Sequence, residues 1–212
     1  MQDATTFWDK SAQKYSKSKI SDMDAYTYTL DRTRSYLSPS DTVLELGCGT
    51  GSTALLLAEH VDHITASDLS GNMLKVGAEK AADQGISNVT FVQSDVLGRA
   101  IDDGPYDAVM AFNLLHLLEN PKAAIKRVGS LLKPGGLFIS KTVCTPGASL
   151  PFKFRLILMV LPLMQWLGKA PYVNFMDIEE LEAMISAEGF EIMEAGNYPA
   201  APPSRYIVAK KV

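Results

Sequence analysis

Short, continuous apolar runs alternate along the chain with longer stretches in which apolar residues recur every three or four positions. The runs Val43–Leu46, Ile64–Ser67 and Asp107–Phe112 predict buried strands, because runs of this length and composition are typical of them. The stretches that follow, such as the one beginning at Ser52, have the periodicity of helices. Alternating strands and helices predict an α/β fold built on a parallel sheet.

The first predicted strand leads directly into a glycine-rich loop, Gly47–Gly51, in which every second residue is glycine. Glycine can adopt positive φ and lets a ligand approach the backbone closely. The helix that follows would present unpaired N–H groups at its N-terminus. Strand, loop and helix together predict the nucleotide-binding corner of an α/β sheet, in preference to a purely structural turn.

Glu45, two residues before this loop, indicates the kind of ligand. A dinucleotide-binding loop would read G-x-G-x-x-G, but the sixth position counted from Gly47 is Ser52. A carboxylate at Glu45 would repel a pyrophosphate, whereas it would attract a ligand end that carries an ammonium and a sulfonium. The form acid-x-G-x-G-x-G resembles the first motif of class I S-adenosylmethionine-dependent methyltransferases.

Two further strings extend the resemblance over nearly the whole chain. They are D-L-S-x-x-M-L at residues 68–74 and L-K-P-G-G-x-F at residues 132–138. The family implies one methyltransferase domain over residues 1–212, folded as a three-layer α/β sandwich. Its mostly parallel seven-stranded sheet would have the order 3-2-1-4-5-7-6, with the last strand antiparallel. Within the family, the chain resembles the small-molecule enzymes of the ubiquinone/menaquinone-biosynthesis-like group.

Asp68 and Asp95 end the second and third predicted strands. A carboxylate at the tip of the second strand can accept both hydroxyls of a ribose, although Asp68 could instead only cap the next helix. The resemblance implies that Asp95 and the backbone N–H of Val96 bind adenine, the alternative for Asp95 being a surface turn. It also implies that Leu69 and Met73 flank the adenine, unless both are plain core residues.

Residues 1–40 predict an N-terminal cap of two helices, one containing Phe7–Tyr15 and the other running from Asp22 to Leu37. The string FWDKSAQKY resembles the W-D-x-x-A-x-x-Y cap of many small-molecule methyltransferases, which folds over the cofactor. Tyr15 would then face the methionine end of the cofactor, or else pack on the sheet with its aromatic neighbours. The complete set expected at the cofactor is Tyr15, Glu45, Gly47, Cys48, Gly49, Gly51, Asp68, Leu69, Met73, Asp95, Val96 and Asn113.

Asn113 and His116 follow the fourth predicted strand and are the candidate catalytic residues, because ligands in open α/β sheets bind beyond the carboxyl ends of the strands. An imidazole could take a proton near neutral pH, but His116 could equally be a structural histidine. Methyltransferases that modify base amino groups often carry Asn/Asp-Pro-Pro-Tyr/Phe here. The sequence Asn-Leu-Leu-His at 113–116 therefore argues against a nucleic-acid acceptor.

Residues 143–176, after the fifth predicted strand, form an insertion too long for an ordinary loop. Its apolar run Leu156–Met164 is broken by Pro162 and is too short to cross a bilayer. Three hypotheses remain: a lid over an apolar acceptor, a helix on a membrane surface centred on residues 150–168, or a face buried against the domain or a second subunit. Its expected apolar lining comprises Phe152, Phe154, Met159, Met164, Trp166 and Tyr172.

Composition narrows the partners of the protein. A net charge of −4 argues against binding to a phosphate backbone. Two cysteines, Cys48 and Cys144, give neither a disulfide framework nor a metal cluster. The N-terminus shows no signal peptide, so a cytoplasmic location is expected, as a monomer or a homodimer.

The sequence thus predicts methyl transfer from S-adenosyl-L-methionine, with S-adenosyl-L-homocysteine as product, to an O, N or C atom of a small lipophilic or aromatic acceptor. No metal is expected. The alternatives are a methyltransferase acting on protein or another macromolecule, an NAD-dependent oxidoreductase and a cofactor-binding module without catalysis.

Overall fold

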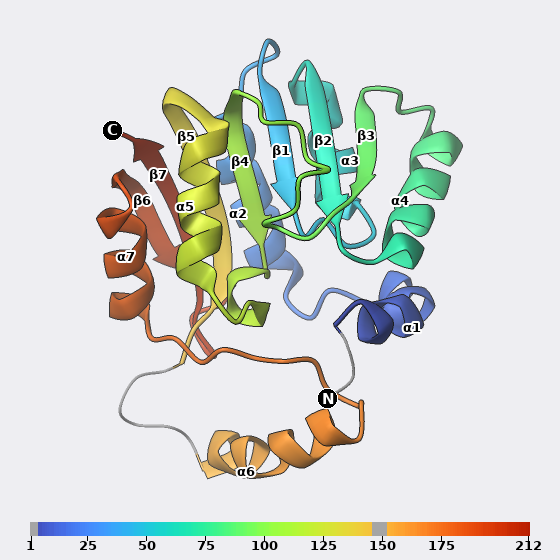
Figure 1. Ribbon diagram of the computed structural model, residues 1–212, viewed down its shortest axis with the longest axis vertical. Coiled ribbons are helices and arrows are strands. Elements are labelled where there is room, and N and C mark those ends of the chain that lie inside the picture. Colours follow the sequence, from blue (N-terminus) through green and yellow to red (C-terminus); the bar gives the residue numbers. More distant parts are fainter. Residues whose placement is uncertain (1–3, 146–151) are drawn as a thin grey trace.

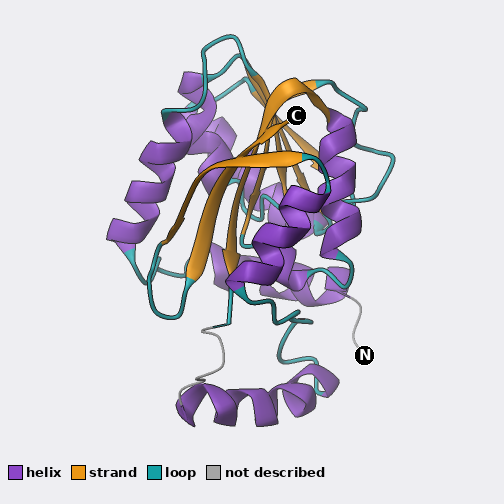
Figure 2. Ribbon diagram, turned by 90° about the vertical axis from the view of Figure 1, so that its left-hand side faces the viewer, coloured by secondary structure: helices purple, strands orange, loops and turns teal. Residues whose placement is uncertain are grey.

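A seven-stranded sheet lies between two layers of helices in the computed structural model, which describes residues 4–145 and 152–212 (Figures 1 and 2). The strands are β1 Thr42–Leu46, β2 His63–Asp68, β3 Val89–Gln93, β4 Tyr106–Phe112, β5 Leu132–Val143, β6 Phe190–Asn197 and β7 Ser204–Lys211. The helices are α1 Ala4–Ser16, α2 Met23–Arg34, α3 Ser52–Leu57, α4 Gly71–Gln84, α5 Pro121–Leu131, α6 Phe152–Trp166 and α7 Ile178–Ala187, with the short 3-10 helices η1 Ala58–His60 and η2 Leu115–Leu117.

The strand order is β3-β2-β1-β4-β5-β7-β6. Strands β1 to β5 pair in parallel, and β7 is antiparallel to both β5 and β6. The predicted sandwich, strand order and antiparallel last strand are therefore confirmed. The chain order reverses direction beside β1, since β2 lies on one side of it and β4 on the other, and this is the place where open α/β sheets bind ligands.

Two apolar clusters fill the two faces of the sheet. Alternate residues of β1 show the division, because Leu44 and Leu46 pack with α5 and α7 while Val43 packs with α3 and α4. Helix α2 joins the second face, where the hydroxyls of Thr33 and Tyr206 lie 3.2 Å apart. Such alternation is what a strand covered on both sides requires.

The predicted N-terminal cap divides into two parts in the structure. Helix α1 lies beyond the C-terminal ends of the strands, beside α4, whereas α2 packs on the sheet (Figure 1). The second predicted helix, Asp22 to Leu37, is shorter than expected because Asp22 is the N-cap, its carboxylate accepting the N–H of Ala25, and the helix ends at Arg34.

The predicted insertion contains α6, which stands apart from the body of the domain at the same end as α1 (Figures 1 and 2). The helix ends at Trp166, and Gly168 just beyond it, with a φ of 67° and an N–H that donates to the carbonyl of Gln165, forms a glycine C-cap. The chain then returns to the domain, where the N–H of Asn174 donates to the carbonyl of His116 (2.7 Å). Among the described residues, no helix is long and apolar enough to cross a membrane.

Candidate functional site

The glycine loop has the conformation that its sequence predicts. Gly47, Gly49 and Gly51 all have positive φ, between 55° and 70°. A Cβ at Gly47 would also lie 2.7 Å from Leu114, and one at Gly51 would lie 2.7 Å from Phe91. Two of the three glycines are therefore required by close packing as well as by backbone conformation.

Asp68 ties this loop to the tip of β2. Its side chain is 9% exposed, and its two oxygens accept the N–H groups of Gly49 and Ser70, each at 2.9 Å. Burial raises the pKa of Asp68, and these two hydrogen bonds oppose the rise. The helix-cap alternative is not what the structure shows, because the hydroxyl of Ser70, not Asp68, accepts the N–H of Met73 at the start of α4.

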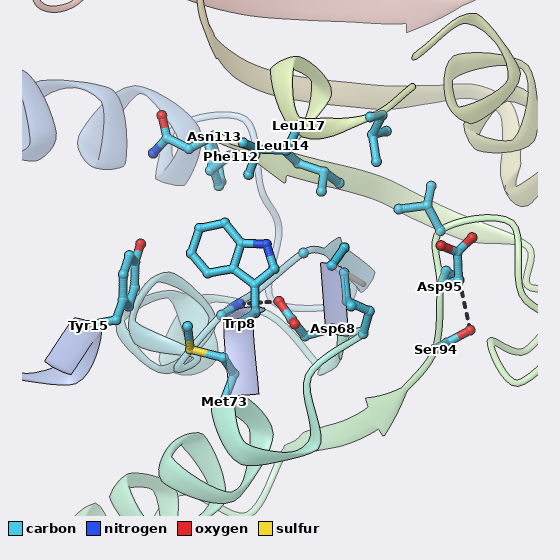
Figure 3. A pocket seen from close by; sticks show the side chains of 16 residues that line it. Trp8, Tyr15, Asp68, Met73, Ser94, Asp95, Phe112, Asn113, Leu114 and Leu117 are labelled. Carbon is cyan, nitrogen blue, oxygen red and sulfur yellow. Dashed lines mark hydrogen bonds between the residues drawn. The ribbon is translucent and has the colours of Figure 1, made fainter. Parts of the chain in front are cut away.

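A small cavity lies beside Asp68 (Figure 3). Its wall brings together most of the residues expected at the cofactor, namely Tyr15, Gly47, Gly49, Asp68, Leu69, Met73, Asp95, Val96 and Asn113. Asp95 is exposed, and one of its side-chain oxygens accepts the N–H of Leu97 (2.8 Å). Asp95 therefore also forms a surface turn, which was the alternative prediction for this residue. The structure thus gathers nine of the predicted residues around one cavity.

Helix α1 covers one side of this cavity, because Ala4, Trp8 and Tyr15 belong to its lining. Asp9 fixes the helix, because one of its carboxylate oxygens accepts the Ser70 hydroxyl at 2.6 Å and the Asn72 N–H at 3.1 Å. Figure 3 shows the indole of Trp8 between Asp68 and Asn113. Sequence reasoning did not place Trp8 or Asp9 in the site, although both belong to the W-D-x-x-A-x-x-Y string.

A larger cleft of about 560 Å³ lies on the other side of Tyr15 and Asn113, which line both cavities. Of the remaining residues expected at the cofactor, Glu45 and Cys48 line this cleft. Gly51, the N-cap of α3, lines neither cavity. The thiol of Cys48 is buried and its pKa is raised well above its ordinary value, mainly by that burial. Cys48 is therefore a packing residue rather than a nucleophile.

Glu45 is the most unusual acid in the cleft. Its side chain is 2% exposed, and Oε2 has no hydrogen-bond partner within residues 4–145 and 152–212. Burial raises its pKa from 4.5 to about 8, an effect that a hydrogen bond from Ala54 opposes and the nearby charge of Asp68 reinforces. A buried carboxyl group with a free oxygen next to a cleft can bind a cation, which would restore its charged form.

Asn113 marks the boundary between the two cavities. It is the one non-glycine residue with positive φ (55°) among the described residues, and its N–H donates to the carbonyl of Lys141 at 2.7 Å. Asparagine tolerates this left-handed conformation better than most residues do. Strained backbone of this kind clusters at functional sites, which agrees with the prediction that Asn113 lies near the reacting centre.

His116 is placed differently from the expectation. It lies in η2, and neither cavity described above includes it in its lining. Burial lowers its pKa to about 4, and Nδ1 has no hydrogen-bond partner in the part of the chain that the structure describes. The structure therefore does not bring His116 together with Asn113 at the site.

Lys141 is a further residue of the cleft that sequence reasoning missed. It belongs to β5, pairs in register with Phe112 of β4 and is 9% exposed. One feature of the sequence could have pointed to Lys141. It is a single basic residue within the apolar run L-F-I-S-K-T-V, near the end of a predicted strand.

Comparisons with known proteins agree with this geometry. Residues 43–136 match a family described as "Methyltransferase domain". A demethylmenaquinone methyltransferase of Staphylococcus carnosus is 28% identical over 189 residues, covering 79% of this chain and 75% of the relative. An uncharacterized methyltransferase of Mycobacterium tuberculosis is 30% identical over 104 residues, which are 49% of this chain and 51% of the relative.

A solved structure shares the whole fold. Magnesium protoporphyrin IX methyltransferase from Synechocystis PCC 6803, with bound SAH, gives a TM-score of 0.71 at 22% identity, covering 99% of this chain and 96% of that chain. A demethylmenaquinone methyltransferase of Staphylococcus aureus is 30% identical over 168 residues, covering 69% of this chain and 66% of the relative. The family match and these relatives, with which the strand order agrees, identify the protein as a class I S-adenosylmethionine-dependent methyltransferase. Within this class its sequence is similar to the demethylmenaquinone methyltransferases.

Proposed function

We propose that this protein transfers the methyl group of S-adenosylmethionine to a small, lipophilic, quinone-like or phenolic molecule. The observation that carries the proposal is the pair of adjoining cavities that share Tyr15 and Asn113. One cavity contains Asp68, and the other contains the partnerless oxygen of Glu45. The relatives that act on demethylmenaquinone support the class of acceptor.

The polar groups on the donor side fit the cofactor. Each Asp68 oxygen already accepts one N–H and retains a lone pair for a ribose hydroxyl. Leu69 and Val96 supply apolar surface for adenine, and Glu45 supplies the counter-charge for an ammonium group. When bound, the cofactor supplies an electrophilic sulfonium methyl group, while the protein orients the two substrates and excludes water from the space between them.

Calorimetry with S-adenosylmethionine, S-adenosylhomocysteine and NAD tests the donor. We expect the first two ligands to bind and NAD to fail, since the loop has Ser52 where a dinucleotide-binding fingerprint has its third glycine. Transfer of a labelled methyl group to quinols, phenols, fatty acids and phospholipids then tests the acceptor. Binding of NAD alone would refute the donor assignment, and transfer only to proteins would refute the acceptor class.

Helix α6 supports a lipophilic acceptor in a second way. Its exposed apolar side chains occupy positions that share one helical face. They are Met159, Val160, Leu163, Trp166 and Leu167. Met159 and Trp166 are 78% and 73% exposed, so this face is not buried against the domain. The side chains of Phe152 and Phe154 fall outside the described residues.

The charge around α6 favours one occupant for this face. Residues 150–169, the segment that contains α6, carry three basic residues and no Asp or Glu, namely Lys153, Arg155 and Lys169, although the net charge of the chain is −4. Two copies packed through α6 would bring like charges together, whereas an anionic bilayer would attract them. We therefore propose that α6 lies on an anionic membrane surface, with its apolar face in the headgroup region.

Vesicle flotation tests this contact. We expect the protein to float with phosphatidylcholine vesicles that contain phosphatidylglycerol, and not with phosphatidylcholine alone. Leu163→Glu with Trp166→Glu should abolish flotation, because two charges would enter the apolar face, and the exposed Met193→Glu on β6 is the matched control. Equal flotation of both variants would contradict the proposal, as would dimers in light scattering that the α6 variant alone disrupts.

A further inference from the structure

A buried lysine remains unused by the function proposed above. Lys141 is 9% exposed, and its side chain lines both the large cleft and a smaller pocket beside Thr29 of α2. Its ammonium group has three donors, and its one hydrogen bond to the described residues is a long one of 3.4 Å to the Thr29 hydroxyl. An ammonium group that is buried with so little hydrogen bonding is costly unless a ligand completes its contacts.

No carboxylate forms an ion pair with Lys141 in the described part of the chain. Asp22 at the start of α2 is the acid whose charge favours the protonated form of Lys141, and burial outweighs it, so that the pKa of Lys141 is lowered. The other polar groups of the surrounding wall include Tyr26 on α2, Thr53 on α3 and Asn113 after β4. The cation therefore faces a cleft without an ion-pair partner of its own.

The position of Lys141 in the sheet separates it from the donor residues. Along the strand order, Asp95 follows β3, Asp68 ends β2, Glu45 lies in β1 and Asn113 follows β4. Lys141 lies one strand further, in β5, and adjacent strands are about 4.8 Å apart. Apart from Asn113, which lines both cavities, the groups assigned to the donor lie on β1, β2 and β3 or on α1, so a ligand that reaches Lys141 lies on the acceptor side of Asn113.

We propose that Lys141 binds an anionic oxygen of the methyl acceptor, such as a phenolate or an enolate of a quinol-type ring. This inference rests on the proposed methyl transfer for its context, and it names the charged group that the acceptor must carry. The ammonium of Lys141 lowers the free energy of the acceptor oxyanion, and the hydroxyl proton of the acceptor passes to solvent. Such an acceptor is nucleophilic without a protein base, which agrees with the position of His116 away from the cavities.

Binding of two matched probes tests the proposal without any methyl transfer. The probes are 2-hydroxy-1,4-naphthoquinone, an anion at neutral pH, and 1,4-naphthoquinone, which is neutral. We expect Lys141→Met to weaken binding of the anion by about tenfold or more and to leave the neutral probe within about twofold, because a charge-assisted hydrogen bond is lost. Lys141→Arg should retain most of the affinity for the anion, and Lys126→Met, an exposed lysine on α5, should change nothing.

Three results would overturn the assignment. The first is that Lys141→Met loses affinity for both probes equally, and the second is that it loses affinity for neither. The third is a tenfold loss of affinity for S-adenosylmethionine while the affinity for the anionic probe is unchanged. In the last case Lys141 would bind the carboxylate of the cofactor instead. Circular dichroism of each variant establishes that it is folded. If the protein proves unable to transfer methyl groups, the probe measurements still decide the role of Lys141.

Discussion

The donor and acceptor sides of the site differ in how completely their polar groups are bonded within the protein. On the donor side, both oxygens of Asp68 accept backbone N–H groups and Asp9 fixes α1 to the start of α4. On the acceptor side, Lys141 makes one long hydrogen bond, and Glu45 at the border between the two sides has an oxygen without a partner. The donor side is preorganised, whereas the acceptor side depends on ligands to complete its contacts.

This difference indicates which substitutions should have general effects and which should have selective ones. Removal of a group that the backbone uses should disturb the glycine loop as well as ligand binding. Removal of a group that only a ligand uses should affect that ligand and leave the fold intact or more stable, because an unpaired buried charge disappears. Each variant below tests that division.

Asp68→Ala should have the largest effect. We expect the affinity for S-adenosylmethionine to fall by about 1–3 kcal/mol, or roughly 5- to 150-fold in Kd, because the ribose and the N–H of Gly49 both lose a charged acceptor. Calorimetry measures the loss. Asp68→Asn, which keeps one acceptor oxygen, should lose less, and the exposed Asp62→Ala should lose nothing. An unchanged Kd in Asp68→Ala would refute the ribose assignment.

Glu45→Gln should have a smaller effect on binding and a characteristic dependence on pH. Because the pKa of Glu45 is raised to about 8, its side chain is mostly protonated at pH 7 before the cofactor binds, and an ammonium partner should cause it to ionise. Binding should therefore release a proton in the native protein, and release less in Glu45→Gln. Calorimetry at pH 7 in buffers of different ionisation enthalpy measures this difference, and equal release from both proteins would contradict the assignment.

The stability of the cofactor-free protein gives an independent check on Glu45. A folded pKa above the unfolded value means that the native state binds the proton more tightly, so stability is lost as the pH rises from about 4.5 towards 8. Glu45→Gln has no carboxyl group at this position and so does not lose this stability. The difference between its melting temperature and that of the native protein should therefore increase from pH 5 to pH 8. Thermal unfolding at the two pH values tests the sign, and the exposed Glu191→Gln on β6 is the control.

The donor side could be predicted from the sequence because its chemistry is local. The glycine spacing fixes the loop, and Asp68 and Asp95 each end a run of strand-forming residues, so the parallel fold brings them to the same edge. The strand order likewise followed from a resemblance carried by short strings. Trp8 and Asp9 were missed because their contacts depend on how α1 docks on α4, which no local pattern specifies.

The acceptor side could be predicted less well because its contacts join distant segments. Lys141 meets Thr29 across 112 residues, and its burial follows from the packing of α2, which sequence reasoning treated as part of a cap. His116 was expected beside Asn113 because the two residues are close in sequence. In the structure His116 lies in the 3-10 helix η2, and its side chain lines neither cavity. The apolar face of α6 was visible in the sequence, whereas its exposure became evident only in the structure.

His116→Gln should have the smallest effect, and it tests the absence of a protein base on the acceptor side. Because burial lowers the pKa of His116 to about 4, its imidazole is already neutral throughout the physiological range. We expect turnover within about twofold of the native protein and no inflection in the pH profile of kcat near the ordinary histidine pKa. A loss of a hundredfold or more in kcat, with an unchanged melting temperature, would restore His116 as the general base. The hydroxyl proton of the acceptor would then pass to His116 and not directly to solvent.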